Sequence, residues 1–172
     1  MKKLAYLNSQ RLCSKEVKRL QDRDFIQKLN HLDQIWKCLK NSYGDILAVK
    51  DLRGKNKEQF SYSELDQLIT RASQSFYNIG VRRGDVVTII SENSPRWLIA
   101  DQAIMRLSAI DAVRGINSPS VELDYIIKHS KSVGLIIQSN SIWEKLENKE
   151  ELLKNLKFII NFEDFSDNGI LS

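Results

Sequence analysis

The chain has 172 residues, of which 42% are apolar and 28% charged, and both fractions are ordinary for a globular protein that buries one core. No apolar run approaches the roughly 20 residues needed to span a bilayer, and the start of the chain lacks the apolar region of a signal peptide. Cys13 and Cys38 have neither metal-site spacing nor the density of a disulfide scaffold. We therefore expect a cytoplasmic protein whose contact with a membrane, if it has one, is peripheral.

The net charge of +4 is unevenly distributed along the chain. Residues 1–30 carry +5, and the remaining residues together carry −1. The body is therefore nearly neutral, which argues against nucleic-acid binding. A basic arm can contact acidic lipid, nucleic acid or an acidic protein, but a solvated helix face is the commoner reason for such a charge.

The first third of the chain predicts two helices. The segment from Ser14 to about Leu29 has a helical composition with a loose apolar stripe. His31 has no second ligand at metal spacing, so we expect it to cap or flank the next helix. That helix ends before Gly44 and has apolar residues at i, i+3, i+4 and i+7. They are Leu32, Ile35, Trp36 and Leu39.

A β-hairpin and a long helix are predicted next. Residues 46–52 and 58–62 form two short strand patterns around a glycine-containing loop. Ser63 is the predicted N-cap of the following helix, with Asp66 three residues later in a capping-box position. The helix ends before Gly80. Its apolar residues, at 3.6-residue spacing, are Leu65, Leu68, Ile69, Ala72, Phe76 and Ile79.

The stretch from Val86 to Pro119 organises the rest of the chain. Val86–Ile90 is an apolar, β-branched run typical of a strand buried on both faces. Pro95 suits the first turn of a helix, where its missing N–H costs nothing. A second short strand follows at Ile110–Val113. A strand, a helix and a strand in under forty residues predict a βαβ unit and hence a parallel sheet.

The remaining residues repeat this plan. A helix is predicted after Ser120, a strand at Val133–Ile137, and a final strand at Phe158–Ile160. Two short helices, at residues 142–146 and 152–156, separate the last two strands. The predicted fold class is therefore α/β: a partial Rossmann-like parallel sheet flanked by helices, with an N-terminal helical arm and a β-hairpin.

The residues do not predict a phosphate site or a nucleophile. Neither G-x-x-x-x-G-K-[ST] nor G-x-G-x-x-G is present, and the chain has only seven glycines. Ser91–Ser94 lies between a strand and a helix, where α/β folds bind anions, but it lacks glycine and Pro95 removes a donor. A structural turn is therefore the better interpretation. His31 and His129 are the only imidazole bases, and no serine lies in a G-x-S-x-G elbow.

Other polar and aromatic residues also have structural explanations. Glu122 and Asp124 lie in the first turn of their helix, where negative charge complements the helix dipole. The three tryptophans are spaced with aliphatic residues, so core packing is favoured over base stacking. They are Trp36, Trp97 and Trp143. The residues by themselves thus predict no catalytic, cofactor-binding or metal-binding residue in this chain.

Four short motifs follow one another in the middle of the chain. They are an aromatic-Ser-Tyr-x-Glu-Leu opening at Phe60–Leu65, Ile-Gly-Val at Ile79–Val81, Arg-Gly-Asp at Arg83–Asp85 and Asn-Ser-Pro-x-Trp at Asn93–Trp97. In this order they resemble the N-terminal segment of the adenylate-forming acyl-activating enzymes of the AMP-binding superfamily. The resemblance extends from Phe60 to Ile137, about half of the chain.

A smaller motif narrows the resemblance within this family. Val113-Arg114-Gly115, followed by Ser-Pro-Ser-Val-Glu-Leu, resembles the long-chain fatty-acid branch of cyanobacteria and plastids, which loads acyl chains onto acyl carrier protein or coenzyme A. Ser108 stands where the family usually has glycine, a departure that we expect to leave the fold unchanged.

The resemblance implies a reaction in two steps. A fatty acid and ATP, with Mg²⁺, give an acyl-adenylate and pyrophosphate, and a thiol then accepts the acyl group. The family's Pro-Lys-Gly phosphate loop, Tyr-Gly-x-Thr-Glu motif, ribose-binding Asp and C-terminal catalytic Lys have no counterpart here. We therefore expect an inactive chain that binds no cofactor itself: a basic helical arm at 1–45 and an incomplete N-terminal subdomain at 46–172.

Two hypotheses from different classes follow. In the first, the chain is the N-terminal part of a long-chain acyl-activating ligase, from a split or truncated gene, and its partner is the missing C-terminal part on another chain. In the second, it is a stand-alone α/β module that binds acidic acyl carrier protein or a membrane surface through its basic arm. An open sheet edge would make the isolated chain prone to self-association.

Overall fold

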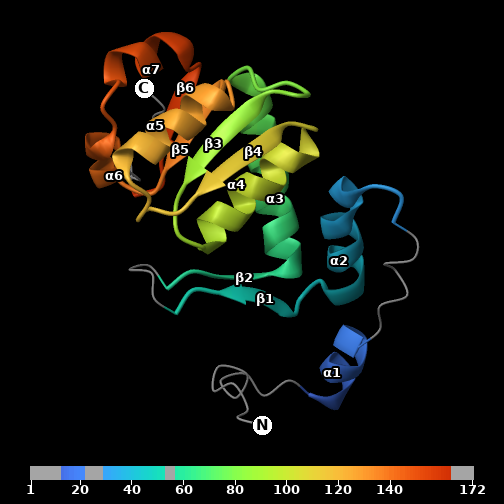
Figure 1. Ribbon diagram of the computed structural model, residues 1–172. Helices are drawn as coiled ribbons and strands as arrows, with labels where there is room; N and C mark the ends of the chain where they lie inside the picture. The colour runs from blue at the N-terminus through green and yellow to red at the C-terminus, as the bar shows by residue number, and fades with distance from the viewer. Residues whose placement is uncertain (1–12, 22–28, 53–56, 164–172) are drawn as a thin grey trace.

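The computed structural model describes residues 13–21, 29–52 and 57–163. Four parallel strands form the main sheet in the order β4-β3-β5-β6, and β1 and β2 form a separate antiparallel pair. The main-sheet strands are β3 (Val86–Ile90), β4 (Ile110–Arg114), β5 (Gly134–Ile137) and β6 (Phe158–Asn161). The α/β fold class and the parallel sheet predicted from the sequence are confirmed (Figure 1).

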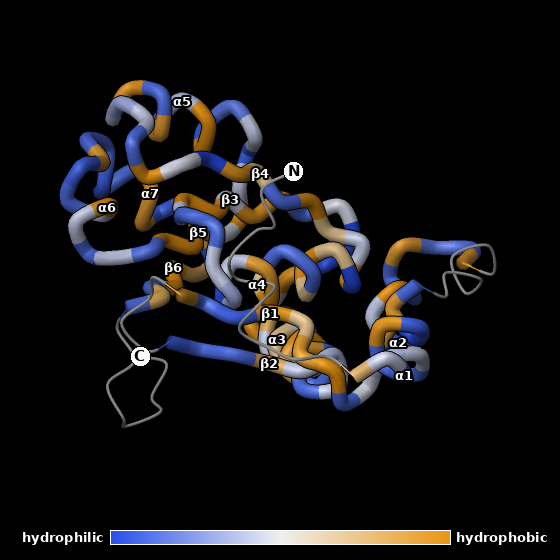
Figure 2. Tube along the Cα trace, turned by 90° about the horizontal axis from the view of Figure 1, so that it is seen from below, coloured by the Kyte–Doolittle hydropathy of each residue, from blue (hydrophilic) through white to orange (hydrophobic). Residues whose placement is uncertain are grey.

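Helices cover both faces of the sheet. Seen from below, α3 (Tyr62–Asn78) and α4 (Pro95–Arg106) lie on one side of the strands, and α5 (Ser120–His129), α6 (Asn140–Lys145) and α7 (Lys149–Asn155) lie on the other (Figure 2). The two short helices α6 and α7 begin two and three residues earlier than predicted.

Each face of the sheet has its own core because successive side chains of a strand point to opposite faces. On β3, Val87 and Ile89 face α3 and α4, and Ile90 faces α5. The α3-side core consists of Leu65, Ile69, Phe76, Val81, Val87, Ile89, Ala100, Ala103, Ile104, Ile136 and Phe162. The α5-side core consists of Ile90, Leu123, Ile127, Leu135, Ile137, Ile142, Leu146 and Leu152.

The polar Thr88 is also fully buried in β3. Its hydroxyl is 2.6 Å from that of Ser132, which in turn is 2.8 Å from the hydroxyl of Ser130. A chain of hydroxyls satisfies the buried group, since each can both donate and accept. The predicted burial of β3 on both faces is thereby confirmed, with its one polar residue hydrogen-bonded.

The N-terminal helices lie outside the sheet and are joined to each other by a few side-chain contacts. Helix α1 (Ser14–Gln21) covers part of the predicted helix, whose residues 22–28 lie outside the described structure. Arg19 joins α1 to α2 (Ile35–Tyr43) by donating to the carbonyl oxygen of Ser42 at 3.0 and 3.2 Å and pairing with Asp45 at 3.2 Å. A short 3₁₀ turn, η3 (Leu32–Gln34), precedes α2, and His31 flanks it without a side-chain cap bond.

The predicted hairpin is present, but the predicted cap of α3 is wrong. Strands β1 (Leu47–Lys50) and β2 (Gln59–Ser61) pair antiparallel with one irregularity. The N-cap is Ser61, whose hydroxyl accepts from the N–H of Glu64 while the Glu64 carboxylate accepts from the N–H of Ser61 at 2.7 Å. The helix begins directly after β2, so the Ser61 and Glu64 pair forms the capping box.

Three helices end in the same backbone motif. After α3, α4 and α5, the N–H of a residue with positive φ donates to the carbonyl oxygen three residues earlier. The N–H of the next residue donates to the carbonyl oxygen five residues before it. These residues are Gly80 (φ 99°), Ser108 (φ 54°) and Lys131 (φ 54°). The glycine was predicted as a helix end. The other two positions lack the sequence signal, because serine and lysine disfavour this conformation.

Candidate functional site at the carboxyl edge of the sheet

The carboxyl ends of the parallel strands meet at one edge of the sheet. The connection after β3 runs through α4 on one face, and the connections after β4 and β5 run through α5 and α6 on the other. α/β sheets bind ligands where neighbouring connections diverge in this way. The polar residues at this edge are Ser91, Glu92, Arg114, Gln138 and Asn161.

Several polar groups of the Ser91–Ser94 turn form hydrogen bonds with neighbouring segments of the fold. The N–H of Ser91 donates to the carbonyl oxygen of Arg114 at 3.1 Å, and the N–H of Glu92 donates to the side chain of Gln138 at 2.9 Å. Ser94 caps α4 by accepting from the N–H of Trp97 at 3.1 Å. These bonds tie β3 to both neighbouring strands, in agreement with the structural turn expected from the sequence.

Arg114 is the last residue of β4 and forms two contacts at the carboxyl edge of the sheet. Its Nη1 donates to the carbonyl oxygen of Val113 at 2.8 Å, and its Nε lies 3.1 Å from the carboxylate of Glu122 on α5. This contact is close enough for an ion pair but is not aligned as a hydrogen bond. Glu122 therefore has a specific partner beyond the helix dipole that its position predicted.

Arg96 connects three segments that are far apart in the sequence. It lies in the first turn of α4 and pairs with Glu58, next to β2, at 2.8 Å. Its Nη1 also donates to the carbonyl oxygen of Phe162, directly after β6. Both charged side chains are about three-quarters buried, so the arginine holds the hairpin against the carboxyl edge of the sheet. Sequence patterns did not indicate this contact, because its partners are 38 and 66 residues away.

Two carboxyl groups lie together at the other side of α4. Asp101 on α4 and Asp111 on β4 are neighbours, and Gln102 donates to Asp101 at 2.6 Å. Burial, reinforced by the neighbouring Asp111 carboxylate, raises the pKa of Asp101 to about 6. The pair joins a helix and a strand ten residues apart, so only the packing of α4 on β4 reveals it.

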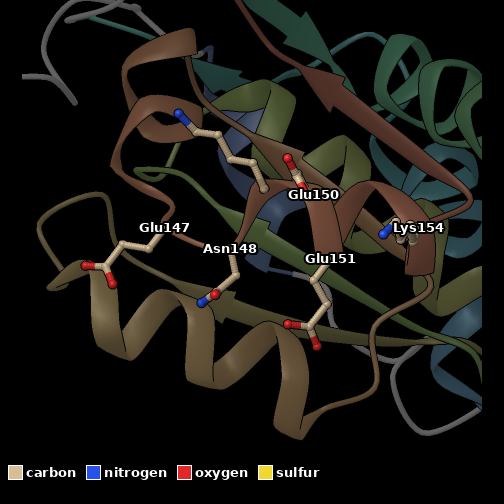
Figure 3. Close-up of a pocket in the computed structure, with 6 residues that line it drawn as sticks. Glu147, Asn148, Glu150, Glu151 and Lys154 are labelled. Carbon is tan, nitrogen blue, oxygen red and sulfur yellow. The ribbon is translucent and has the colours of Figure 1, made fainter.

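A hollow of about 480 Å³ lies over the turn between α6 and α7. Its lining is charged with both signs: Glu147, Asn148, Lys149, Glu150, Glu151 and Lys154. Asn148 and Glu151 point toward α5 (Figure 3), where Asn148 donates to the buried Asp124 at 3.2 Å and Glu151 pairs with Lys128 at 2.7 Å. Because these groups are paired to neighbouring helices, the hollow is a feature of helix packing.

The structure also places the histidine and the tryptophans for which the sequence predicted structural roles. His129 is exposed and stacks on Tyr125 with 5.0 Å between ring centroids. Trp36 and Trp97 pack on the α3-side core and Trp143 on the α5-side core, as predicted. In the described residues, no three His, Cys, Asp or Glu side chains are arranged to hold a metal ion. None of the described helices is both long and apolar enough to cross a bilayer.

The fold is an α/β sheet, and polar side chains at its carboxyl edge bond mainly within the fold. The model of the family described as "AMP-binding enzyme" matches residues 38–171. The chain therefore belongs to the AMP-binding enzyme family, and it corresponds to the N-terminal part of these adenylate-forming enzymes. The resemblance read from the motifs is confirmed.

Two plant relatives cover 73% of the chain. "Probable acyl-activating enzyme 16, chloroplastic" of Arabidopsis thaliana is 32% identical over 126 residues, and "Long-chain-fatty-acid--[acyl-carrier-protein] ligase AEE15, chloroplastic" of the same plant is 29% identical. The aligned part spans only 18% and 17% of these relatives. The chain is thus similar to less than a fifth of each.

The solved structures confirm the fold. The crystal structure of the N-terminal domain of FACL13 from Mycobacterium tuberculosis superposes with a TM-score of 0.71 over 81% of this chain and 36% of that domain. The identity is 13%, so the likeness concerns the fold alone.

Proposed function

We propose that the chain forms the N-terminal portion of an ATP-dependent ligase that activates long-chain fatty acids and transfers them to acyl carrier protein or coenzyme A. The family match over residues 38–171 carries this proposal. The relative named as a long-chain fatty acid and acyl carrier protein ligase, together with the Val-Arg-Gly sequence at the end of β4, supports the long-chain branch.

The chain is proposed to be inactive by itself. The phosphate loop and the catalytic lysine that the family uses have no counterpart in its sequence. In the Ser91–Ser94 turn, the N–H groups of Ser91 and Glu92 donate within the fold. The residues present therefore do not fit ATP or Mg²⁺, which other parts of a complete enzyme would hold. Residues 1–45 form a basic arm and 46–172 an incomplete subdomain in this proposal.

The remaining part of such an enzyme is the proposed partner, with acyl carrier protein or coenzyme A and a fatty acid as its substrates. The proposed location is cytoplasmic, and the charge of residues 1–30 supports weak contact of the basic arm with acidic lipid. The alternative of a stand-alone binding module has only this charge behind it, and no contact among the described residues favours it.

Fatty-acid-dependent exchange between ATP and pyrophosphate tests the proposal in two arms. The chain alone should show background exchange with palmitate, and exchange above background would contradict its inactivity. In the second arm, residues 38–163 replace the corresponding segment of the Arabidopsis ligase. A folded chimera should exchange pyrophosphate with long-chain but not short-chain acids. A folded chimera without exchange would contradict the assignment to a ligase.

A further inference from the structure

Strand β4 is an open edge of the parallel sheet. Within the described residues it pairs only with β3. The N–H of Ile110 donates to Asp85 at 2.8 Å, and the carbonyl oxygen of Arg114 accepts from Ser91 at 3.1 Å. Alternate residues of a parallel strand bond to the same neighbour, so the backbone groups of Asp111 and Val113 point to the open side.

The open edge carries an exposed apolar side chain, Ile110, and an acidic side chain, Asp111, which is a neighbour of Asp101. Ile110 is 54% exposed at the start of the strand. Val113 packs against the α3-side core, so Asp111, two residues earlier, also points to the α4 side, where Asp101 is its neighbour. The ion pairs of the described residues include neither carboxylate. The edge therefore holds half-buried negative charge without a cation.

The neighbouring cations are engaged elsewhere. On α4 itself, Arg106 pairs with Asp66 of α3 at 3.1 Å, and Lys40 of α2 pairs with the same carboxylate at 3.2 Å. Arg114 lies on the α5 side of β4 with Glu122. The other charged residues on the elements packed against α4 are Asp33 on η3 and Glu64 and Arg71 on α3. Among the described residues, Asp111 is the charged neighbour that raises the pKa of Asp101.

A second copy is a poor occupant of this edge at neutral pH. Two β4 strands paired antiparallel about Ala112 would place each Asp111 opposite Val113 of the other copy. The two acidic pairs would then be diagonal neighbours on one face, about 7–8 Å apart, where like charges destabilise a sheet. Inward-pointing charge on an edge strand is a known safeguard against self-pairing.

We propose that the open edge of β4 binds an extended segment of a protein partner that carries a lysine or arginine on the α4 side, facing Asp101 and Asp111. The backbone groups of Asp111 and Val113 pair with the segment, and an apolar residue of the segment covers Ile110. The cation neutralises both carboxylates, which gives the edge its selectivity. The inference does not depend on the ligase reaction, because it concerns binding and not activation.

A labelled peptide titration tests the proposal. The ¹⁵N-labelled chain is titrated near neutral pH with the peptide Thr-Thr-Val-Lys-Val-Thr-Thr, blocked at both ends, whose valines lie on the opposite face of the strand from its lysine. The matched peptide has glutamate in place of lysine. We expect the amide signals of Asp111 and Val113 to shift, with about ten-fold tighter binding of the lysine peptide. Equal binding of the two peptides, or shifts elsewhere only, would overturn the proposal.

Two variants and a pH series separate the contributions. Asp111→Asn should remove most of the lysine preference and increase the dimer fraction in size-exclusion chromatography. Glu122→Gln, which removes a carboxylate from the α5 side of the same edge, should keep the preference. Lowering the pH through about 6, the pKa of Asp101, should weaken lysine-peptide binding, because Asp101 takes up a proton and loses its charge.

Three results would count against the proposal. They are a lysine preference that survives in Asp111→Asn, an equal loss of preference in Glu122→Gln, and a dimer of the parent chain at neutral pH that protects the amides of Asp111 and Val113. The last result would make a second copy the occupant. Thermal unfolding of each variant verifies that it is folded before the comparison.

Discussion

The parallel sheet and the N-terminal hairpin are held together in different ways. The sheet has a core on each face, and its central strand β3 is buried on both. The hairpin of β1 and β2 has two short strands, and its apolar residues are only partly buried against the α3-side core. A two-stranded hairpin is marginal by itself, so the hairpin depends on contacts such as the pair of Arg96 and Glu58.

Most of the stability of this chain therefore comes from the sheet and its two cores, and the hairpin depends on its contacts with them. Regions with few buried contacts open at a lower free energy than the core. The hairpin should therefore exchange its amide hydrogens faster than β3 and β5, although the strands are paired in both regions.

The largest expected effect compares one truncation in each region. Ile89→Ala removes a fully buried side chain from β3 and should lower the free energy of unfolding by about 2–5 kcal/mol. Val49→Ala removes a half-buried side chain from β1 and should cost about 1 kcal/mol. Urea denaturation measures both. Equal costs would break the distinction between the two regions.

A second prediction concerns close packing inside the sheet. A Cβ atom on Gly134 would lie 2.1 Å from the ring of Phe158, which stacks on Phe76 with 6.1 Å between centroids. Gly134→Ala should therefore destabilise by about 1–3 kcal/mol through overpacking. The same change in a Phe158→Leu background should cost much less in thermal unfolding. If Gly134→Ala costs as much in the Phe158→Leu background as in the parent chain, the steric clash does not involve the Phe158 ring.

The junction between the hairpin and α3 gives a smaller effect. Ser61→Ala should destabilise by about 1 kcal/mol because it removes the capping hydroxyl, and Ser63→Ala should change stability by less than about 0.5 kcal/mol. Chemical denaturation of both variants provides the comparison. A larger effect at Ser63 would restore the cap position suggested by the sequence.

The same cap has a pH dependence with a definite sign. The backbone N–H and then the hydroxyl of Ser61 lower the pKa of Glu64 in the folded chain. The stabilisation is therefore present above the ordinary glutamate value of about 4.3 and is lost as the pH falls through the lower folded value. The difference between Ser61→Ala and the parent should shrink over this acidic range.

The smallest expected effect is a gain in stability. Ser108 is exposed and has φ 54°, a left-handed conformation that favours glycine. The fold tolerates the serine, as expected, but Ser108→Gly should raise the free energy of unfolding by about 0.5–1 kcal/mol. Gly80→Ala, at the equivalent position after α3, should lower it. A loss of stability in Ser108→Gly would show that the serine side chain has a compensating role.

The sequence by itself determined the elements with strong periodic patterns. The β-branched run at Val86–Ile90, the 3.6-residue spacing in α3 and the position of Pro95 each produce the expected element, because short-range sterics and burial act on neighbouring residues. The ordered motifs between Phe60 and Ile137 likewise indicated the family that the comparison confirms.

Only the tertiary structure decided which polar residues meet. The pairing of Arg96 with Glu58 and the proximity of Asp101 to Asp111 join different elements. Strand order and helix packing bring these residues together, and no local sequence pattern predicts that they are neighbours. The capping box moved to Ser61 for a related reason, because β2 ends where α3 begins. Contacts across elements depend on the packing of the whole sheet, so they become visible only in the fold.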